Sequence, residues 1–471
     1  MLPLGGGSAL RPRDARPAAF RSILAAGSRG MPRRLIGLDA ERGPSRPVPP
    51  VVIGSRFQQA VTMSVSHWQR ESRRLVSSLV NRCGGVATPH EAVTVDEWAE
   101  SASEDDGFRL RSQVAWQLPG GRSVAGDLAA AEAVAAAIDS PIGQARYRQH
   151  LWGPSSRSHE TFVVSLAGGR VAHSTGLVVT ADNRVLTGGS GIAVSCPHPT
   201  NPLRLSHLPR PRPLAGSLAV LTSFAGKNYY HWFASGLARL RLYEEAGVAR
   251  DANWYVAVDA AFQRESLRLL GIAPERIVPA TPRRHLRPER LLVSSWRDQQ
   301  LAPEDCDFLH RRLTQHLAAD RPADRRLFIM RRRPGRRSIV NQSDVLRALA
   351  PLGFEPVRLE RLPLAEQIGL FHRAECVVGS HGAGLTNLLF CRPGAVAVEI
   401  ATPCRVLPCF AEIAHHRHLD HHLELARPVN RRHFDPITGI GDSDLLVDAE
   451  AIRDRVERLL TEMRPARRPA A

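Results

Sequence analysis

A glycine-rich segment at residues 379–387 carries the clearest chemical pattern in the sequence. It reads GSHGAGLTN and directly follows the apolar run Cys376–Val378. Glycines let the main chain approach a ligand closely, and the start of a following helix offers free N–H groups and a positive dipole end to an anion. We therefore predict that a diphosphate binds at Ser380, His381, Gly382, Ala383 and Gly384.

Two better-known motifs do not fit this segment, and a structural interpretation stays open. The spacing is G-x-x-G-x-G, whereas the dinucleotide-binding fingerprint is G-x-G-x-x-G. Val378 occupies the first glycine position of the nucleophile elbow G-x-S-x-G, which excludes that motif. The alternative is a tight turn in which Ser380 acts as a cap.

Charged residues follow two other apolar runs. Arg331 and Arg332 come directly after Leu327–Met330, where guanidinium groups could bind phosphate oxygens through paired hydrogen bonds. Glu399 lies near the end of the run 396–400, where a carboxylate could accept the hydroxyls of a ribose. The alternatives are an arginine triplet that only reflects an arginine-rich composition and a solvated strand end.

The segment KNYYHW at residues 227–232 opens an expected helix in the first half of the chain. Asn228 is a good N-cap, which explains that residue without a ligand. Tyr230 and Trp232 offer aromatic faces to a sugar, and His231 could act as a base near neutral pH. We predict His231 as the catalytic base and assign Asn228, Tyr230 and Trp232 to the acceptor or sugar.

The sequence gives no pattern typical of a metal site or a disulfide framework. The histidine-rich stretch 415–422 matches no standard zinc spacing. No pair of carboxylates of the D-x-D type ends an expected strand. We therefore expect no metal and no required cofactor. Seven cysteines, an odd number without a C-x-x-C pair, favour a reducing compartment.

The net charge of +17 rests almost wholly on arginine, because Lys227 is the only lysine. Such a charge suggests nucleic acid or an anionic membrane. However, the arginines are dispersed along the chain, so we do not expect a nucleic-acid partner. Acidic or phosphorylated substrates fit the charge. With no run near 18 apolar residues and no signal-peptide pattern, we expect a cytoplasmic protein, with peripheral association at the inner face of a membrane left open.

Apolar runs that alternate with helical patterns are expected to position these residues. In the second half, expected strands at 327–330, 355–358, 376–378 and 396–400 alternate with expected helices at 305–317, 343–349, 364–372 and 385–390. In the first half, short strands at 162–166, 177–180 and 184–186 precede strands at 218–222, 254–258, 277–278 and 291–293 and helices at 229–245 and 261–270. This alternation predicts parallel sheets with helices on both faces.

We therefore predict an α/β protein with two Rossmann-like domains that face a cleft. The first domain, residues 61–300, has a β-rich entrance and is expected on the acceptor side. The second, residues 301–471, is expected to bind the donor. Residues 1–60 are rich in arginine, proline and alanine and read as a disordered basic tail. A last helix at 449–463 is expected to pack back across both domains.

Taken together, these segments resemble glycosyltransferase family 61, which includes many bacterial proteins of capsular polysaccharide biosynthesis. Residues 228–232 with Arg239 and Leu240 resemble its first motif, and RLFIMRR at 326–332 with Arg337 and Asn341 resembles its second. Its third motif is matched at 354–355, 364–371 and 379–387, with Asn387, Leu389, Phe390, Pro393, Gly394 and Glu399. The resemblance covers residues 160–425 in the family's order.

The resemblance implies a GT-B fold and inverting, metal-independent transfer from a nucleotide-sugar, which we expect to be a UDP-sugar, to a hydroxyl of a glycan or polysaccharide. It also implies site roles for Arg337, Asn341 and Asn387. Ser235 departs from the family pattern, since relatives often carry an acidic residue there, and this leaves His231 as the candidate base. A member that binds nucleotide or glycan without turnover and an arginine-rich nucleic-acid-binding protein are the alternatives.

Overall fold

The structure is a computed structural model. It describes residues 85–89, 91–102, 106–118, 155–190, 203, 205, 207–297, 301–318, 321–331, 336–402, 405–435 and 440–466. The chain divides into two compact units, Met1–Ser66 and His67–Ala471, and every described residue belongs to the second. The expected tail at 1–60 and the candidate Arg332 lie outside the described residues.

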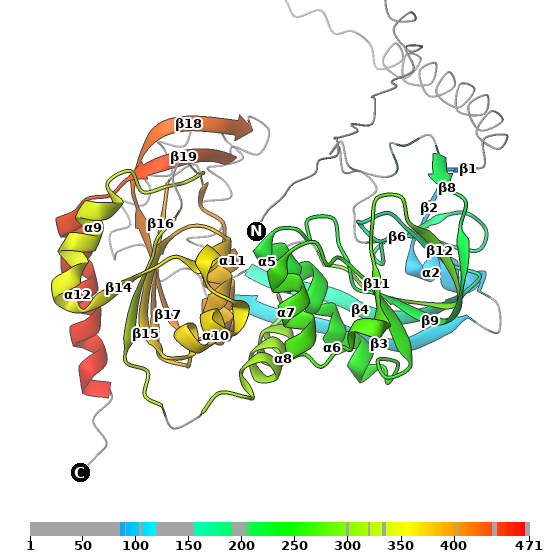
Figure 1. The fold of residues 1–471 in the computed structure, drawn as a ribbon, viewed down its shortest axis with the longest axis horizontal. Coiled ribbons are helices and arrows are strands. Elements are labelled where there is room, and N and C mark those ends of the chain that lie inside the picture. Colours follow the sequence, from blue (N-terminus) through cyan, green and yellow to red (C-terminus); the bar gives the residue numbers. More distant parts are fainter. Residues whose placement is uncertain are drawn as a thin grey trace, which may run out of the picture. The chain divides into compact units, whose positions relative to one another are not determined.

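Five parallel strands form the sheet of the C-terminal part (Figure 1). In spatial order they are β14 (Phe354–Val357), β13 (Arg325–Ile329), β15 (Ala374–Ser380), β16 (Val396–Ala401) and β17 (Asp420–Leu425). In chain order this arrangement is 2-1-3-4-5, a doubly wound sheet whose strand order reverses between β13 and β15. The predicted strands and their parallel arrangement in this half are confirmed.

Helices cover both faces of this sheet (Figure 1). On one face lie α9 (Gln342–Leu349) and α12 (Ala449–Ala466), and on the other lie α10 (Leu364–His372), α11 (Cys409–His416) and the 3₁₀ helix η6 (Ala383–Phe390). Successive strand residues alternate between the faces. Leu327, Val377 and Ala397 point to the side of α10 and α11, and Phe328, Val378 and Val398 point to the side of α9 and α12.

The last helix differs from its predicted role. Its buried residues Ile452, Val456 and Leu459 form one apolar stripe at helical spacing and pack in the same core as Val345 and Leu349 of α9. This core contains only residues of the C-terminal part. The expectation that the helix packs across both domains is therefore corrected: α12 completes the C-terminal sheet.

The N-terminal part is built on a mixed sheet of ten strands. Four of them are parallel and neighbour one another: β12 (His285–Ser294), β9 (Arg212–Val220), β10 (Ala252–Val256) and β11 (Ile277–Pro279). The other six are β4 (Ser155–Ala167), β5 (Arg170–Ala172), β6 (Leu177–Val179), β7 (Val185–Leu186), β2 (Ala92–Val93) and β3 (Gly107–Leu118). The α/β class is confirmed, but only the parallel strands have the character expected of a Rossmann-like domain.

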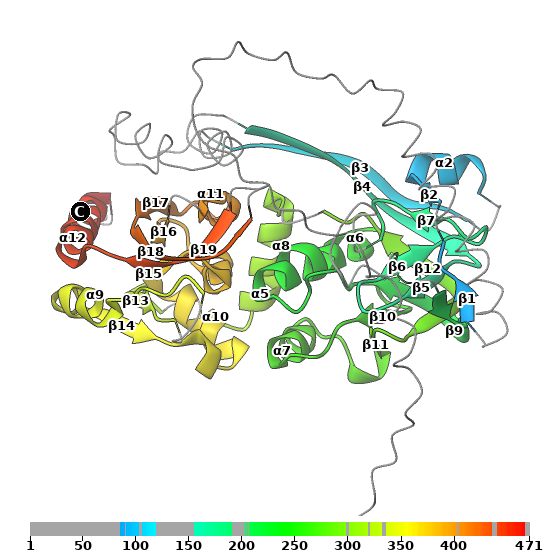
Figure 2. The same cartoon turned by 90° about the horizontal axis from the view of Figure 1, so that it is seen from above.

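Two features of this half were not predicted. Strands β3 and β4 pair as a long antiparallel ribbon, which Figure 2 shows extending from the sheet. The single helix expected at 229–245 is divided into α5 (Tyr229–His231), the π-helical η2 (Trp232–Leu237) and α6 (Arg239–Glu245). Short π-helical turns within helices are often found at functional sites.

Shorter elements complete the described fold. The helices are α2 (Val95–Glu100), α7 (Ala261–Leu269), α8 (Pro303–Thr314), η3 (Pro274–Arg276), η4 (Ala350–Leu352) and η5 (Leu359–Arg361). Two small sheets pair β1 (Gly85–Ala87) with β8 (His207–Pro209) and β18 (Arg427–Asp435) with β19 (Ile440–Leu446). Within the described ranges, no helix has the length and apolar character needed to cross a membrane.

Candidate active site

The carboxyl ends of β13 and β15 meet where the strand order of the parallel sheet reverses. Ile329 of β13 is paired with Gly379 of β15, so the residues that follow each strand lie side by side. Nη1 of Arg331 donates a hydrogen bond of 3.1 Å to the main-chain oxygen of His381. Ligands of doubly wound sheets bind at this kind of switch point. The structure thus brings together Arg331 and the glycine turn, two segments singled out separately in the sequence.

Gly382 allows this contact. A Cβ atom at this position would lie 2.9 Å from Nη1 and 3.0 Å from Cζ of Arg331. The φ angle of 168° is extended backbone that any residue adopts, so close approach is what requires the glycine here. At Gly384 a Cβ atom would lie 2.9 Å from Cδ1 of Leu359, which makes this glycine a packing residue in the structure.

The turn is followed by η6, so the helix expected here is present as a 3₁₀ helix. Leu385 N–H donates to the carbonyl of Gly382 at 2.9 Å, and Gly382 carries no side-chain cap. The first N–H groups of a helix have no partner inside it. The hydroxyl of Ser380 is buried and has no hydrogen-bond partner within the described residues. Buried polar groups are rarely unpaired in native proteins, and a ligand oxygen at the turn would give this hydroxyl a partner.

Three further arginines gather around one carboxylate beside the turn. Asp442 of β19 accepts a hydrogen bond of 3.3 Å from Nη1 of Arg336, and its Oδ1 lies 3.6 Å from Nε of Arg337 and 3.6 Å from Nη1 of Arg405. The Nε groups of Arg337 and Arg405 have no hydrogen-bond partner within the described residues. Positive charge therefore exceeds negative charge in this cluster, which favours an anion beside it.

Burial makes this excess of charge costly. Burial, and next the charges of Arg331 and Arg405, lower the pKa of Arg337 to about 10. Burial is also the largest cause that lowers the pKa of Arg331, although Asp442 opposes it. Both arginines still carry their charge at neutral pH. An anion bound between them would remove the repulsion that the free protein contains.

His381 also turns its ring toward a carboxylate. Nδ1 of His381 is hydrogen-bonded to Oε1 of Glu399, and Nε2 of His421 is hydrogen-bonded to Oε2 of Glu399 at 2.9 Å. Glu399 is 3% exposed. With both carboxylate oxygens engaged and the side chain buried, Glu399 is not presented to a ribose in this structure. This differs from the role expected from the sequence.

Two contacts join the segment at 227–232 to the glycine turn. The Tyr229 hydroxyl donates a hydrogen bond of 2.6 Å to Oδ1 of Asn387, and Nδ2 of Asn387 donates to Gln367 at 3.0 Å. The ring of Phe410 packs against Tyr230 at a centroid distance of 5.6 Å and against His381 at 5.0 Å. The first and third sequence motifs are therefore neighbours.

The other predicted residues of the first motif differ in exposure. His231 is half-buried at the end of α5, next to the ring of Tyr230. Asn228 uses its side chain as the helix cap and accepts from the N–H of Tyr230 at 2.9 Å. Trp232 is 1% exposed and donates to Ser266 at 2.9 Å. The Trp232 ring therefore belongs to the core and offers no face to a sugar, which corrects that expectation.

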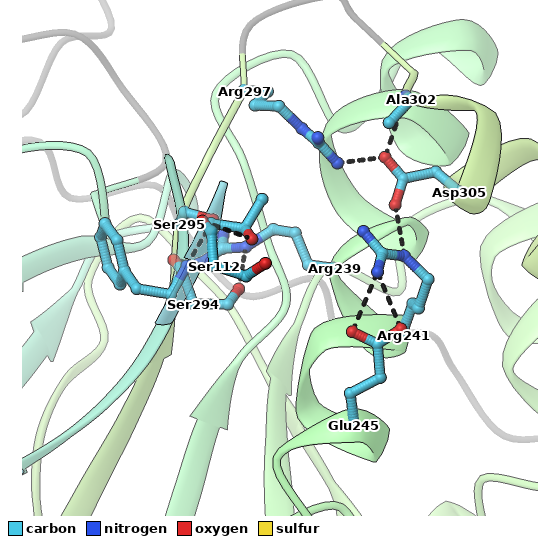
Figure 3. Close-up of polar contacts among 11 residues, drawn as sticks. Ser112, Arg239, Arg241, Glu245, Ser294, Ser295, Arg297, Ala302 and Asp305 are labelled. Carbon is cyan, nitrogen blue, oxygen red and sulfur yellow. Dashed lines mark hydrogen bonds and ion pairs between the residues drawn. The ribbon is translucent and has the colours of Figure 1, made fainter. Parts of the chain in front are cut away.

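Figure 3 shows how two arginines hold the helix of the first motif in place. Arg239 donates to Oγ of Ser294 at 2.8 Å and to the main chain of Ser294 at 2.9 Å. Arg241 donates to Asp305 of α8 at 2.8 Å, and Asp305 also contacts Arg297. Arg239, which matches the family motif, is thus a buried side chain whose hydrogen bonds join the helix to the end of β12.

Asn341 likewise has a structural role in this conformation. Its Nδ2 donates to the carbonyl of Val447 at 2.7 Å, and its Oδ1 accepts from the N–H of Val447 at 3.1 Å. This pair of bonds ties the start of α9 to the chain after β19, which carries Asp442. Asn341 therefore helps to fix the position of β19, which carries the carboxylate of the arginine cluster.

A cavity of about 660 Å³ opens beside Arg331. It is lined by Met330, Arg331, Gln342, Ser343, Arg358, Glu360 and Arg361. The N–H of Arg331 donates to Oε1 of Gln342 at 2.9 Å, which fixes the main chain at the rim. The volume lies in the range of ligand pockets, and the lining is mostly polar, with three arginines and one glutamate.

Sequence reasoning missed several residues of this site: Gln342, Arg405, Phe410, His421 and Asp442. Arg405 lies in the segment that follows the expected strand 396–400, so the rule that led to Arg331 could have led to it as well. Asp442 gave no signal, because only the fold brings β19 to this edge. Within the described part of the chain, no group of three or more His, Cys, Asp or Glu side chains could hold a metal ion.

Comparison with known proteins identifies the class to which this site belongs. The family model described as "Glycosyltransferase 61" matches residues 229–398, which run from the first motif to the strand that carries Glu399. The matched region is a glycosyltransferase domain. The resemblance to glycosyltransferase family 61 seen in the sequence is confirmed over these residues.

Curated relatives match a shorter stretch. The chain is 32% identical over 94 residues to the "EGF domain-specific O-linked N-acetylglucosamine transferase" of Gallus gallus, which is 19% of this chain and 17% of the relative. It is 33% identical over 112 residues to the protein of the same name from Xenopus laevis, 22% of this chain and 21% of the relative. The matches thus span about a fifth of either relative.

Proposed function

We propose that this protein transfers a sugar from a nucleotide-sugar, and specifically from a UDP-sugar, to a hydroxyl of a glycan or polysaccharide such as a capsule precursor. The donor would bind to residues 301–471 and the acceptor to residues 61–300, in a GT-B arrangement of two domains facing a cleft. Transfer would invert the anomeric centre and need no metal or other cofactor. The proposal places the protein in the cytoplasm, free or at the inner face of the membrane.

The contact between Arg331 and Gly382 is the observation that carries this proposal. It places a guanidinium against the main chain of a glycine turn at the switch point of the sheet. Arg337 and Arg405 add positive charge that one carboxylate, Asp442, only partly neutralises. A nucleoside diphosphate supplies the negative charge that such a cluster lacks.

The chemistry follows from that position. The acceptor oxygen forms a bond to the anomeric carbon, and the bond between that carbon and the phosphate oxygen breaks with its electron pair on the diphosphate. Fixed arginines stabilise this developing charge without moving, which is where electrostatic catalysis is most effective. His231 would take the proton of the acceptor hydroxyl. Its neighbour Tyr230 touches Phe410, which touches His381, so the proposed base and diphosphate site are close in the fold.

A protein hydroxyl is the second candidate acceptor, and N-acetylglucosamine is the first sugar to test. Both suggestions rest on the names of the relatives, which describe N-acetylglucosamine transferases specific for EGF domains. Both acceptor classes require the same donor site, so the arginine cluster does not distinguish between them.

The test is donor consumption followed by mass spectrometry. The protein is incubated in EDTA with UDP-, GDP- and CMP-sugars, with and without a pool of glycan acceptors or a folded EGF domain. We expect consumption of a UDP-sugar that increases with an acceptor. Binding of UDP without any turnover would instead support the non-catalytic alternative, and binding to random DNA with a steep salt dependence would support a nucleic-acid-binding protein.

A further inference from the structure

A buried carboxylate holds the ring of His381 at the proposed diphosphate site. Glu399 and His381 are 3% and 4% exposed, and Oε1 of Glu399 is hydrogen-bonded to Nδ1 of His381. Burial alone would raise the pKa of Glu399, but the hydrogen-bonded partners His381 and His421 outweigh burial and lower it. An ionised carboxylate only accepts hydrogen bonds, so Nδ1 of His381 is the protonated nitrogen.

This arrangement leaves Nε2 of His381 as the ring nitrogen that can gain or lose a proton. Nε2 is hydrogen-bonded to no described residue, and it is not fully buried. The main-chain oxygen of the same residue accepts from Arg331. The backbone of His381 therefore contacts Arg331, and Nε2 of its ring remains available to a ligand at the same turn.

The charges around His381 oppose one another. Burial is the largest cause that lowers its pKa, and the nearby charges of Arg337 and Arg405 lower it further, while Glu399 raises it. The free protein thus favours neutral imidazole. A bound diphosphate would offset the two arginines and give an Nε2–H group an acceptor, and both changes favour the imidazolium.

We propose that binding of the sugar nucleotide places a proton on Nε2 of His381, and that Glu399 orients and stabilises the resulting imidazolium. The proton comes from solvent, stays on His381 while the sugar–phosphate bond breaks, and returns to solvent when the diphosphate leaves. His381 would then donate a hydrogen bond to the diphosphate and add a positive charge to those of the arginines. Glu399 is a positioning residue in this scheme. The inference rests on the proposed function and deepens it.

The sign of the pH dependence follows from linkage. Below the pKa of His381 in the free protein the ring is already charged, and above its pKa in the complex it stays neutral. Between these two values, donor binding takes up as much as about one proton, and the affinity falls by up to about tenfold for each unit that the pH rises.

Calorimetric titration with UDP-N-acetylglucosamine tests the proposal, because this diester has no phosphate group that titrates near neutral pH. Binding heats measured in buffers of different ionisation enthalpy give the number of protons taken up for each donor bound. The variants are His381→Gln, which removes the titrating ring, and Glu399→Gln, which keeps the shape of the carboxylate without its charge. His316→Gln is the matched control, since His316 is exposed near the end of α8.

We expect proton uptake in the wild-type protein and in His316→Gln, and its loss in His381→Gln. Glu399→Gln should reduce the uptake and weaken the dependence of affinity on pH, while circular dichroism shows an unchanged fold. Donor binding by the wild-type protein without proton uptake, or equal uptake in His381→Gln, would overturn this inference and leave the proposed function intact. If no sugar nucleotide binds at all, the proposed function fails and this inference fails with it.

Discussion

Arg331 and His381 are fifty positions apart in the chain, yet Nη1 of the first donates a hydrogen bond of 3.1 Å to the main-chain oxygen of the second. This bond joins the ends of β13 and β15 at the point where the order of the parallel strands reverses. It therefore places a charged side chain from one sequence motif on the glycine turn of another. Substitutions at and around this bond distinguish a donor site from an arrangement that only stabilises the sheet.

Gly382→Ala should weaken donor binding with little loss of stability. The added Cβ atom would lie 2.9–3.0 Å from the guanidinium of Arg331, which is the flexible end of a side chain and can move away. The φ angle is extended, so the backbone tolerates alanine. We expect a higher Kd for UDP in calorimetry and a melting temperature close to that of the wild type.

Gly369→Ala is the control for this substitution. Gly369 lies in α10, and no atom lies within 4 Å of a Cβ built there. Alanine in a helix is more stable than glycine by about 1 kcal/mol, so this variant should be as stable as the wild type or slightly more stable. Equal UDP affinity in Gly382→Ala and Gly369→Ala would show that the position of Arg331 does not matter for the donor.

Asp442→Asn should destabilise the free protein and increase its response to the donor. Asp442 is the carboxylate shared by Arg336, Arg337 and Arg405, and its loss leaves their charges unopposed. We expect a loss of about 1–3 kcal/mol in the free energy of unfolding. UDP should then raise the melting temperature by more than in the wild type, because the diphosphate replaces the missing negative charge.

The exposed carboxylate of Asp344 provides the comparison for Asp442. It pairs with Arg347 on the surface of α9, where an ion pair contributes little to stability. Asp344→Asn should change neither the melting temperature nor the shift caused by UDP. A smaller UDP shift in Asp442→Asn than in the wild type would mean that Asp442 does not compete with a bound anion.

Tyr229→Phe should lower stability by about 1–3 kcal/mol, because Oδ1 of the buried Asn387 would lose its donor. The ring contacts with Phe233 and Phe262 would remain. Denaturant unfolding measures the loss. UDP affinity should also fall, since Asn387 lies in η6 directly after the glycine turn.

Tyr255→Phe separates stability from binding. Tyr255 donates to the carbonyl of His173 at 2.9 Å within the N-terminal sheet, away from the glycine turn. It should lower stability in the same way while leaving the UDP affinity unchanged. If both variants bind UDP equally well, the bond between Tyr229 and Asn387 is structural only.

The local sequence predicted the C-terminal sheet well because its strands are continuous apolar runs that are each followed by a helical pattern. The run Cys376–Val378 and the helix at 364–372 appear in the structure almost as predicted. The ends of these runs also led to Arg331 and the glycine turn. Strand-end rules work here because parallel strands bring their carboxyl ends to one edge of the sheet.

Other features depend on contacts between distant segments, which local patterns do not contain. Asp442 reaches the arginines only because β19 returns to the carboxyl edge of the sheet. Trp232 has the composition of a sugar-stacking residue, but tertiary packing buries it against Phe262 and Ser266. Glu399 was assigned to a ribose because a single position cannot reveal that two histidines, His381 and His421, occupy its oxygens.

His231→Gln should reduce turnover much more than donor binding. His231 lies on the helix of the first motif, whereas the arginines belong to the C-terminal sheet. As a general base it would contribute roughly 10²–10⁴ in rate. Single-turnover transfer measures the chemical step, and UDP titration measures binding. A near-normal single-turnover rate in a folded variant would show that another group accepts the acceptor proton.

The affinity of UDP for the Arg331→Ala variant, measured by calorimetry in EDTA, shows whether Arg331 binds the diphosphate of the donor without a metal. A charge-assisted hydrogen bond is worth about 1.5–3 kcal/mol, so we expect a Kd that rises by roughly 10- to 150-fold. Arg347→Ala, which removes a 76% exposed arginine from α9, should bind UDP as the wild type does. Equal affinity in Arg331→Ala and Arg347→Ala, or wild-type binding that EDTA abolishes, would show that Arg331 does not bind the donor in a metal-independent site.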